Sequence, residues 1–212
     1  MTGLQPLPPR GVYGITPASL CHDLPALSKA VAQALDGGLA VLQYRDKCSD
    51  SAHKLKHASA LKRLCANYAV PLIINDDVAL AKAVAADGVH LGLNDAELAT
   101  ARTLLGPNAI IGATCADSLA RAAEAAAAGA SYLAFGAFYP SRTKPQAPQP
   151  PASLLTSARR QFELPICAIG GINGSNAKAL VDAGAHFVAA IESIFSAPDI
   201  TAAVFSLRRA FP

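Results

Sequence analysis

Residues 34–45 read ALDGGLAVLQYR, an Ala-rich helix end that passes through two glycines into an apolar strand. Glycine is a common cap after a helix, and an apolar run of this length suits a strand that is buried on both faces. The same order of features returns three times along the chain. The three further copies are AVAADGVHLG at 83–92, AAAAGASYLAFG at 125–136 and LVDAGAHFVAAI at 180–191.

Four more short apolar runs lie before and between these copies, and several of them open on proline or glycine. Amphipathic helical stretches follow nearly every run, so strands and helices alternate along the chain. Alternating strands that are apolar on both faces predict a parallel sheet. The four runs are GVYGIT (11–16), PLIIN (71–75), NAIIGA (108–113) and PICAIG (165–170).

Eight strand–helix units of roughly 25 residues each account for the length of the chain. They predict an α/β fold, a single-domain (β/α)8 TIM barrel over residues 1–212. We expect a barrel core from about 11 to 208 and an N-terminal extension at 1–10. The alternative is an open doubly wound sheet, but no glycine-rich dinucleotide fingerprint follows the first strand.

The composition argues against several classes of protein. The chain is 52% hydrophobic and 16% charged with a net charge of +3, and no basic run suggests nucleic acid. Its longest uncharged run, 125–141, is broken by a helix end and a turn, so we expect no membrane insertion. Five cysteines in no CxxC pattern predict reduced thiols in a cytoplasmic protein. Whether the protein forms a homo-oligomer stays open.

In a barrel of this kind the active site lies at the C-terminal ends of the strands. Gln43, Arg45 and Lys47 follow Val41 at intervals of two, so their side chains point to one face. Burying an unpaired cation costs several kcal/mol, which predicts an anionic ligand there. The residues that follow the other strands are Asn75, Asp76, His90, Asp95, Thr114, Ser141, Arg142, Thr143, Lys144, Gly171, Ile191 and Glu192.

Two cations beside carboxylates suit a polyphosphate with a divalent metal. Mg²⁺ prefers one or two carboxylates with phosphate oxygens, which fits Asp76 and Asp95 on adjacent strands. Arg45 and Lys47 would take the remaining phosphate charge. The glycine pair at 170–171 can present backbone N–H groups to an anion, in the loop region that often binds phosphate in such barrels.

Five motifs in order resemble the thiamine-phosphate synthase family along nearly the whole chain. They are QYRDK (43–47), INDD (74–77), ADGVHLG (86–92) with Asp95, PSRTKP (140–145) and AIGGI (168–172). The resemblance implies a transferase that joins a pyrimidine methyl diphosphate to a thiazole phosphate and releases pyrophosphate with Mg²⁺. It also implies that the C–O bond breaks before the new bond forms. The proline-rich loop 137–151 would then be a lid that excludes water.

The resemblance also assigns the site residues. Asp76 and Asp95 would bind Mg²⁺, and the catalytic residues would be Lys144, Arg45 and Lys47. The pyrimidine diphosphate would contact Gln43, Arg45, Lys47, Asn75, Thr114 and Lys144. The thiazole phosphate would contact Ser141, Arg142, Thr143, Gly171, Ile191 and Glu192.

Glu192 departs from the family, which has a phosphate-binding serine at this position. At ~5 Å and an effective dielectric constant of ~20, a carboxylate would repel a phosphate charge by about 3 kcal/mol. Glu192 motivates one alternative, a non-catalytic paralogue that binds thiamine precursors. A thiazole tautomerase-like isomerase of the same barrel family is the other, although it needs no pyrophosphate site and the retained Arg45, Lys47, Asp76 and Asp95 argue against it. Whether a carboxythiazole phosphate is also accepted stays open as well.

Simpler interpretations accompany several of these residues. Asp76 and Asp95 could be helix N-caps, although Asp77 is the better cap for the helix after 71–75. His53 and His57 have the i, i+4 spacing of metal ligands, but their lysine neighbours favour a solvated helix face. We interpret His90 as a residue of the barrel interior.

Overall fold

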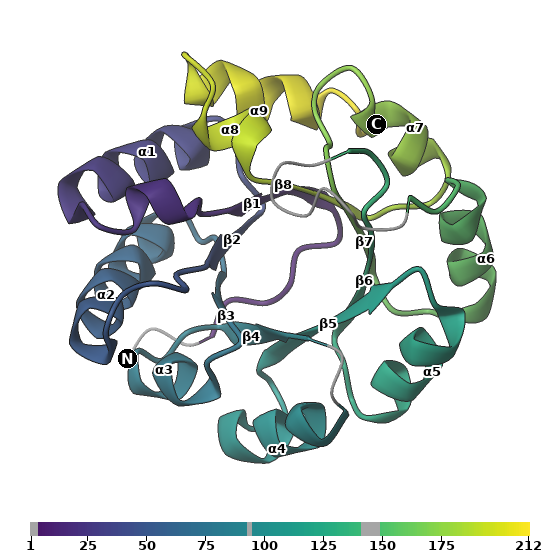
Figure 1. The fold of residues 1–212 in the computed structure, drawn as a ribbon, viewed down its shortest axis with the longest axis horizontal. Helices are drawn as coiled ribbons and strands as arrows, with labels where there is room; N and C mark the ends of the chain where they lie inside the picture. The colour runs from purple at the N-terminus through teal and green to yellow at the C-terminus, as the bar shows by residue number, and fades with distance from the viewer. Residues whose placement is uncertain (1–3, 93–94, 141–148) are drawn as a thin grey trace.

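The computed structural model describes residues 4–92, 95–140 and 149–212 and shows a closed parallel barrel within a ring of helices (Figure 1). Each strand pairs with its neighbour in sequence, and β8 closes onto β1. The predicted TIM barrel is confirmed, and the open sheet is excluded. The strands are β1 (Gly11–Ile15), β2 (Val41–Tyr44), β3 (Leu72–Asn75), β4 (Gly88–Leu91), β5 (Ile110–Ala116), β6 (Tyr132–Gly136), β7 (Ile166–Ile169) and β8 (Phe187–Ala190).

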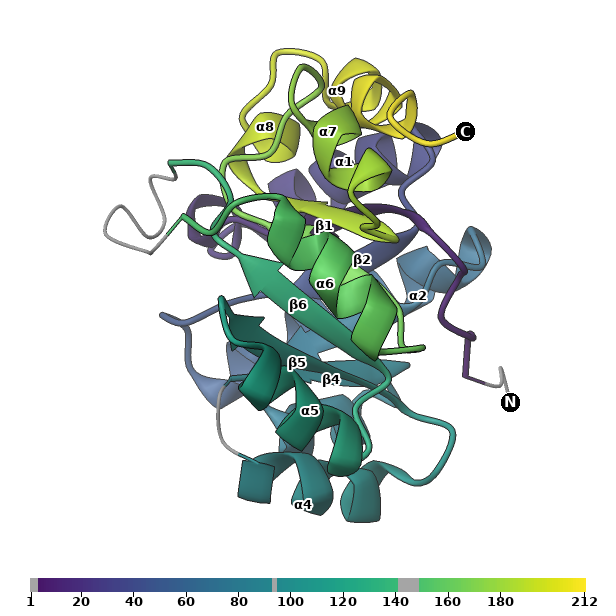
Figure 2. The same ribbon diagram turned by 90° about the vertical axis from the view of Figure 1, so that its right-hand side faces the viewer.

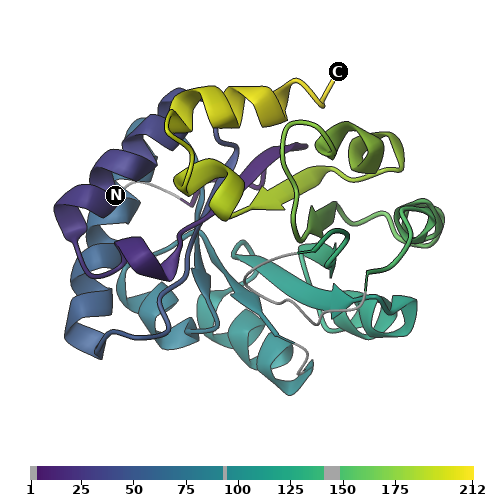
Figure 3. The ribbon, with the colours of Figure 1, turned by 45° about the horizontal axis from the view of Figure 1, so that its top comes forward.

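Helices cover the outside of the barrel, and the last helix lies beside the first (Figure 3). Among the residues that the structure describes, no helix is both long enough and apolar enough to cross a membrane. The helices are η1 (Ala18–Leu20), α1 (Leu24–Asp36), α2 (Ser51–Asn67), α3 (Val78–Ala83), α4 (Asp95–Leu105), α5 (Leu119–Ala127), α6 (Ser153–Gln161), α7 (Ala177–Asp182), α8 (Glu192–Phe195) and α9 (Ile200–Arg208).

The helix-end repeats of the sequence form left-handed caps, with one exception to the expected glycine. Gly38, Gly129 and Gly184 have φ of +87°, +88° and +115°, as a glycine cap requires. In the copy at 83–92, Ala85 takes the left-handed position, with a φ of 49°. Gly88 of that copy starts β4 instead, where a side chain would collide with the carbonyl of Ile110.

The N-terminal segment closes the end of the barrel opposite the strand tips. The arrow of β6 points away from the N-terminus (Figure 2). Leu7 packs against the cluster of buried residues inside the barrel. The backbone N–H of Gln5 donates to Oδ1 of Asp87, 2.6 Å away, at the start of β4. The same carboxylate accepts from Lys62 Nζ at 2.6 Å and is fully buried.

The prediction that His53 and His57 form a solvated helix face is wrong for His57, which is 2% exposed. The turn after η1 lies over the start of α2, where the carbonyl of Cys21 is 2.8 Å from Nε2 of His53. The two imidazoles are in contact, with ring centroids 4.0 Å apart. Burial, and then the neighbouring His53, lower the pKa of His57.

Candidate active site

A cavity of about 910 Å³ lies at the carboxyl ends of the strands. Every strand contributes to its lining, either directly or through the residues that follow it. The structure brings nine predicted site residues together around this cavity. They are Gln43, Arg45, Lys47, Asn75, Asp76, Thr114, Gly171, Ile191 and Glu192.

Five predicted residues cannot be placed in the same way. Ser141, Arg142, Thr143 and Lys144 lie outside the described residues, as does much of the loop 137–151. The backbone of Asp95 begins α4, but its side chain also lies outside what the structure describes. Their roles therefore stay predictions.

The end of β2 is tied down so that alternate side chains reach the cavity. β2 ends at Tyr44, and beyond it the Arg45 N–H donates to Thr16 Oγ1 at 2.9 Å. The Tyr44 hydroxyl donates to Asp46, whose other oxygen accepts from the N–H groups of Cys48 and Ser49. Burial works to raise the pKa of Asp46, but these donors outweigh it and lower the pKa. Asp46 thus anchors the turn, while Arg45 and Lys47 stay on the cavity side.

Asp76 is presented at the mouth by an uncommon backbone conformation. Its φ of 62° is left-handed, a conformation that costs free energy in a residue other than glycine and gathers at functional sites. Asn75 Nδ2 donates to Asp76 Oδ2 at 2.7 Å, and Lys47 Nζ lies 3.6 Å from the same oxygen. Asp77, not Asp76, caps α3 by accepting from the N–H of Leu80, as predicted.

The donor chemistry of Asp76 fits Mg²⁺. Its carboxylate is 54% exposed and only loosely paired with Lys47, so its oxygens remain accessible to a hard cation. Among the described residues, no three His, Cys, Asp or Glu side chains converge to hold a metal. A single carboxylate supplemented by ligand phosphate oxygens is the arrangement that Mg²⁺ commonly adopts.

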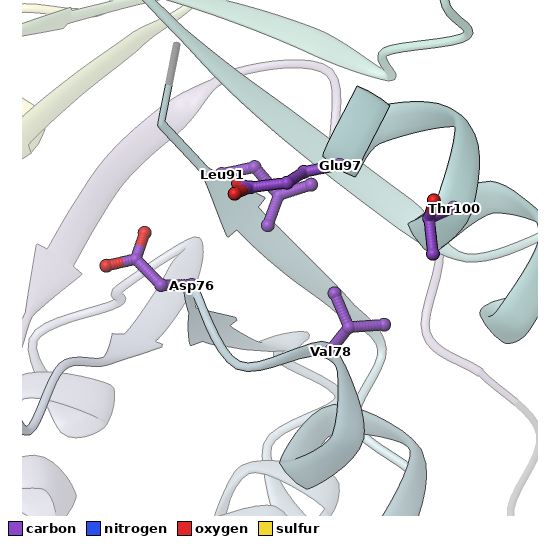
Figure 4. Close-up of a pocket in the computed structure, with 5 residues that line it drawn as sticks. All are labelled: Asp76, Val78, Leu91, Glu97 and Thr100. Carbon is purple, nitrogen blue, oxygen red and sulfur yellow. The ribbon is translucent and has the colours of Figure 1, made fainter. Parts of the chain in front are cut away.

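A smaller cavity of about 250 Å³ adjoins Asp76 (Figure 4). Its other lining residues include Glu97 and Thr100 of α4 and Val78 of α3. The Glu97 carboxylate extends toward the Asp76 side of this cavity. The sequence analysis did not single out Glu97, because an acidic residue in the first turn of a helix is common.

The turn after β7 and the start of α8 form the opposite side of the cavity. Gly170 and Gly171 have φ of +105° and +61°, so the turn depends on glycine. Ser193 Oγ donates to the carbonyl of Ile172 at 2.6 Å and joins this turn to α8. Glu192 is exposed, and its Oε2 accepts from Ser196 Oγ at 3.1 Å.

Two tyrosines that the sequence analysis did not single out form part of a polar chain across the cavity. Gln43 Nε2 donates to the Tyr13 hydroxyl at 2.9 Å, and the hydroxyls of Tyr13 and Tyr132 are 2.7 Å apart. The Tyr132 hydroxyl lies 2.8 Å from His90 Nδ1, and His90 Nε2 lies 2.9 Å from Thr114 Oγ1. Because a buried phenol needs a polar partner, tyrosines within strands could have signalled such a chain.

The fold and the cavity define a TIM-barrel protein with cationic and acidic side chains at the C-terminal mouth of its strands. The profile of the family described as thiamine monophosphate synthase matches residues 12–194. The chain belongs to this family. Membership confirms the resemblance stated from the sequence motifs and the expected transferase class.

Several known proteins are similar to the chain over nearly its whole length. A thiamine-phosphate synthase of Azoarcus sp. is 51% identical and covers 90% of this chain and 91% of its own. A thiamine-phosphate synthase of Thiobacillus denitrificans is 48% identical, with coverages of 96% and 95%. The structure of thiamine phosphate pyrophosphorylase from Pyrococcus furiosus is 32% identical, with a TM-score of 0.84 and 94% coverage of both chains.

Proposed function

We propose that the chain condenses 4-amino-2-methyl-5-(diphosphooxymethyl)pyrimidine with 4-methyl-5-(2-phosphooxyethyl)thiazole to give thiamine phosphate and pyrophosphate. The observation that carries this proposal is the convergence of Arg45, Lys47 and Asp76 with Gly171 on one cavity. The name of the matching family, and the names thiamine-phosphate synthase and thiamine phosphate pyrophosphorylase of the similar proteins, support these two substrates.

Arg45 and Lys47 would bind the diphosphate and stabilise it as it leaves. Negative charge grows on the pyrophosphate when the C–O bond breaks, so cations fixed beforehand stabilise the transition state more than the substrate. Arg45 offers a planar pair of donors to phosphate oxygens, whereas Lys47 supplies a mobile point charge.

By family resemblance Lys144 would add a third cation. We expect Lys144→Ala to lower kcat more than it raises KM for the thiazole, and an unchanged kcat would contradict this role.

Asp76 and Asp95 would hold Mg²⁺, which supplies neutralising charge to the leaving pyrophosphate when it is bound. Asn75 restrains the Asp76 carboxylate by donating to one of its oxygens, and the backbone conformation keeps that carboxylate at the mouth. This arrangement supports a metal role for Asp76 over the helix-cap interpretation.

The condensation is balanced without a protein nucleophile or base. The electrons of the C–O bond leave with pyrophosphate, and the lone pair of the thiazole nitrogen forms the new C–N bond. No proton is lost in the net reaction. The protein's remaining tasks are to orient the pyrimidine, through Gln43 and Thr114, and to exclude water from the pyrimidine methyl cation. We assign the second task to the loop 137–151.

The thiazole phosphate would bind to the backbone of Gly171 and Ile191. The bond from Ser196 to Glu192 supports an arrangement in which this carboxylate is restrained away from the phosphate. The family resemblance adds Ser141, Arg142 and Thr143 to this set.

None of the five cysteines forms a disulfide, which supports a reducing compartment and the predicted cytoplasmic location.

A coupled assay for pyrophosphate tests the function. Release should require both substrates and Mg²⁺ together. A tautomerase would instead convert a thiazole carboxylate phosphate alone and without Mg²⁺, and a precursor-binding paralogue would bind but release nothing. Either of those results would overturn the proposed synthase.

A further inference from the structure

The polar chain of the cavity has an unusual composition for a barrel interior. Tyr13 and Tyr132 are 1% and 0% exposed, Gln43 is 3% exposed, and His90 and Thr114 are half-buried. Four successive hydrogen bonds of 2.7 to 2.9 Å join these five side chains. Gln43 at one end and Thr114 at the other both line the cavity.

The proton of each hydroxyl in the chain can serve only one acceptor at a time, so the chain has a direction. The amide N–H of Gln43 donates to Tyr13, and the proton of Tyr13 therefore goes to Tyr132. Tyr132 then donates to His90 Nδ1. His90 must carry its proton on Nε2, which donates to Thr114 Oγ1.

This direction fixes what each end offers to a ligand. Gln43 Oε1 makes no hydrogen bond within the described part of the chain and remains an acceptor. The hydroxyl of Thr114 already accepts from His90, so its own proton is available as a donor. Reversing either end requires reversing all four bonds, because one misdirected bond leaves a buried phenol proton without an acceptor.

Burial keeps both phenols of the chain protonated. It raises the pKa values of both Tyr13 and Tyr132 well above the ordinary value, so both phenols stay protonated at neutral pH. Each phenol therefore always has one proton to donate, and neither can act as an acceptor alone.

We propose that Tyr13, Tyr132 and His90 are positioning residues that make the cavity selective for an aminopyrimidine over the corresponding oxopyrimidine. The inference rests on the proposed function and deepens it. An amino group would donate to Gln43 Oε1, and a ring nitrogen would accept from Thr114. An oxopyrimidine places a carbonyl against Gln43 Oε1, so two acceptors meet. Binding it well would require Gln43 to flip, the chain to reverse and His90 to move its proton to Nδ1.

Binding of two unreactive ligands tests this selectivity without turnover. The ligands are the 5-(phosphooxymethyl) derivatives of 4-amino-2-methylpyrimidine and of its 4-oxo analogue, titrated by calorimetry. The wild-type protein should bind the amino compound at least about tenfold more tightly, because a site built for one hydrogen-bond pattern rejects the reverse pattern. Tyr13→Phe and Tyr132→Phe keep the ring but remove the hydroxyl, and each should reduce the preference to within about threefold.

Tyr44→Phe is the matched control. It removes the hydroxyl of a tyrosine that is 2% exposed, and this hydroxyl donates to Asp46 and lies outside the chain. Both ligands carry the same phosphate, so any shift of the Asp46 turn should affect them equally and keep the wild-type preference. Tight binding of the amino compound with an unchanged preference in both chain variants would overturn the polarity argument while leaving the synthase intact. Failure of the wild-type protein to bind either ligand would overturn both.

The proton position on His90 can be measured directly in the ligand-free protein. The protein has five histidines, and the ¹⁵N resonances lost in His90→Gln identify the relevant ring. We expect the proton on Nε2 in the wild-type protein and a mixture of tautomers in Tyr132→Phe. A proton found mainly on Nδ1 of the wild-type His90 would overturn the proposed direction, whether or not the protein is a synthase.

Discussion

The two ends of the barrel treat charged residues in opposite ways. At the N-terminal end, Asp87 is fully buried, and it accepts from Lys62 and from the backbone N–H groups of Gln5 and Leu72. At the C-terminal mouth, Asp76 is 54% exposed and lies 3.6 Å from a Lys47 that is 57% exposed. A carboxylate whose acceptors are all occupied holds the fold together, whereas a loosely paired one remains available to a ligand.

The comparison predicts the largest change in stability for a substitution at the N-terminal end of the barrel, which the N-terminal segment closes. Lys62→Met leaves the buried Asp87 without its cation, so we expect the free energy of unfolding to fall by about 3–5 kcal/mol. Urea unfolding followed by circular dichroism measures this loss. Adding Asp87→Asn to the same chain should recover part of the stability. A loss below about 1 kcal/mol would show that the ion pair is not structural.

The next largest effect is expected at the mouth. Asp76→Ala should lower Mg²⁺-dependent pyrophosphate release about a hundredfold or more, because a proposed metal ligand is lost. Its unfolding free energy should fall by no more than about 1 kcal/mol, because alanine adopts the left-handed φ of 62° less readily than aspartate. Steady-state rates over a Mg²⁺ titration, together with urea unfolding, separate the two effects. Near wild-type turnover would remove Asp76 from the metal site.

A smaller effect is expected where α8 meets the mouth. Ser196→Ala releases the Glu192 carboxylate, so KM for the thiazole phosphate should rise several-fold. In a Glu192→Ser background the same change should have no effect, because no carboxylate remains to be released. The double-mutant cycle on KM measures this coupling. Additive effects of the two substitutions would show that Ser196 does not restrain Glu192.

The smallest effect is a pH dependence of stability at the closed end. His186 Nδ1 accepts from the N–H of Ile166 at 2.9 Å, and burial lowers the His186 pKa. Its contribution is complete above the unfolded pKa of about 6.5 and is lost as pH falls through the lower, folded pKa. His186→Asn should flatten the decline in unfolding free energy between pH 7 and pH 5. An unchanged slope would assign that decline to other groups, of which His57 is one.

The sequence predicted the barrel well because each strand–helix unit carries its own local signals. An Ala-rich helix end, its glycine cap and an apolar strand are all visible in the 12 residues 34–45. It also predicted which strand ends carry the charged residues, because in a TIM barrel those ends meet at one mouth.

The sequence could not predict contacts that depend on strand register and on tertiary cover. Tyr13 and Tyr132 are 119 residues apart, and each is a plausible core aromatic on its own strand. Only closure of the barrel brings their hydroxyls together. His57 was misjudged for a similar reason, since the turn after η1, which contacts the neighbouring His53, belongs to a different unit. The restraint on Glu192 depends on a side-chain rotamer, which the pattern of residues does not determine.

The account depends most on the mouth residues acting together on a diphosphate. Calorimetric titration with inorganic pyrophosphate, with and without Mg²⁺, measures this directly. We predict binding that strengthens at least tenfold with Mg²⁺ and weakens strongly in Arg45→Ala and in Asp76→Ala, while Lys62→Met binds normally below its unfolding temperature. Pyrophosphate binding that is absent, or is equally strong in Arg45→Ala and in the wild-type protein, would contradict the account.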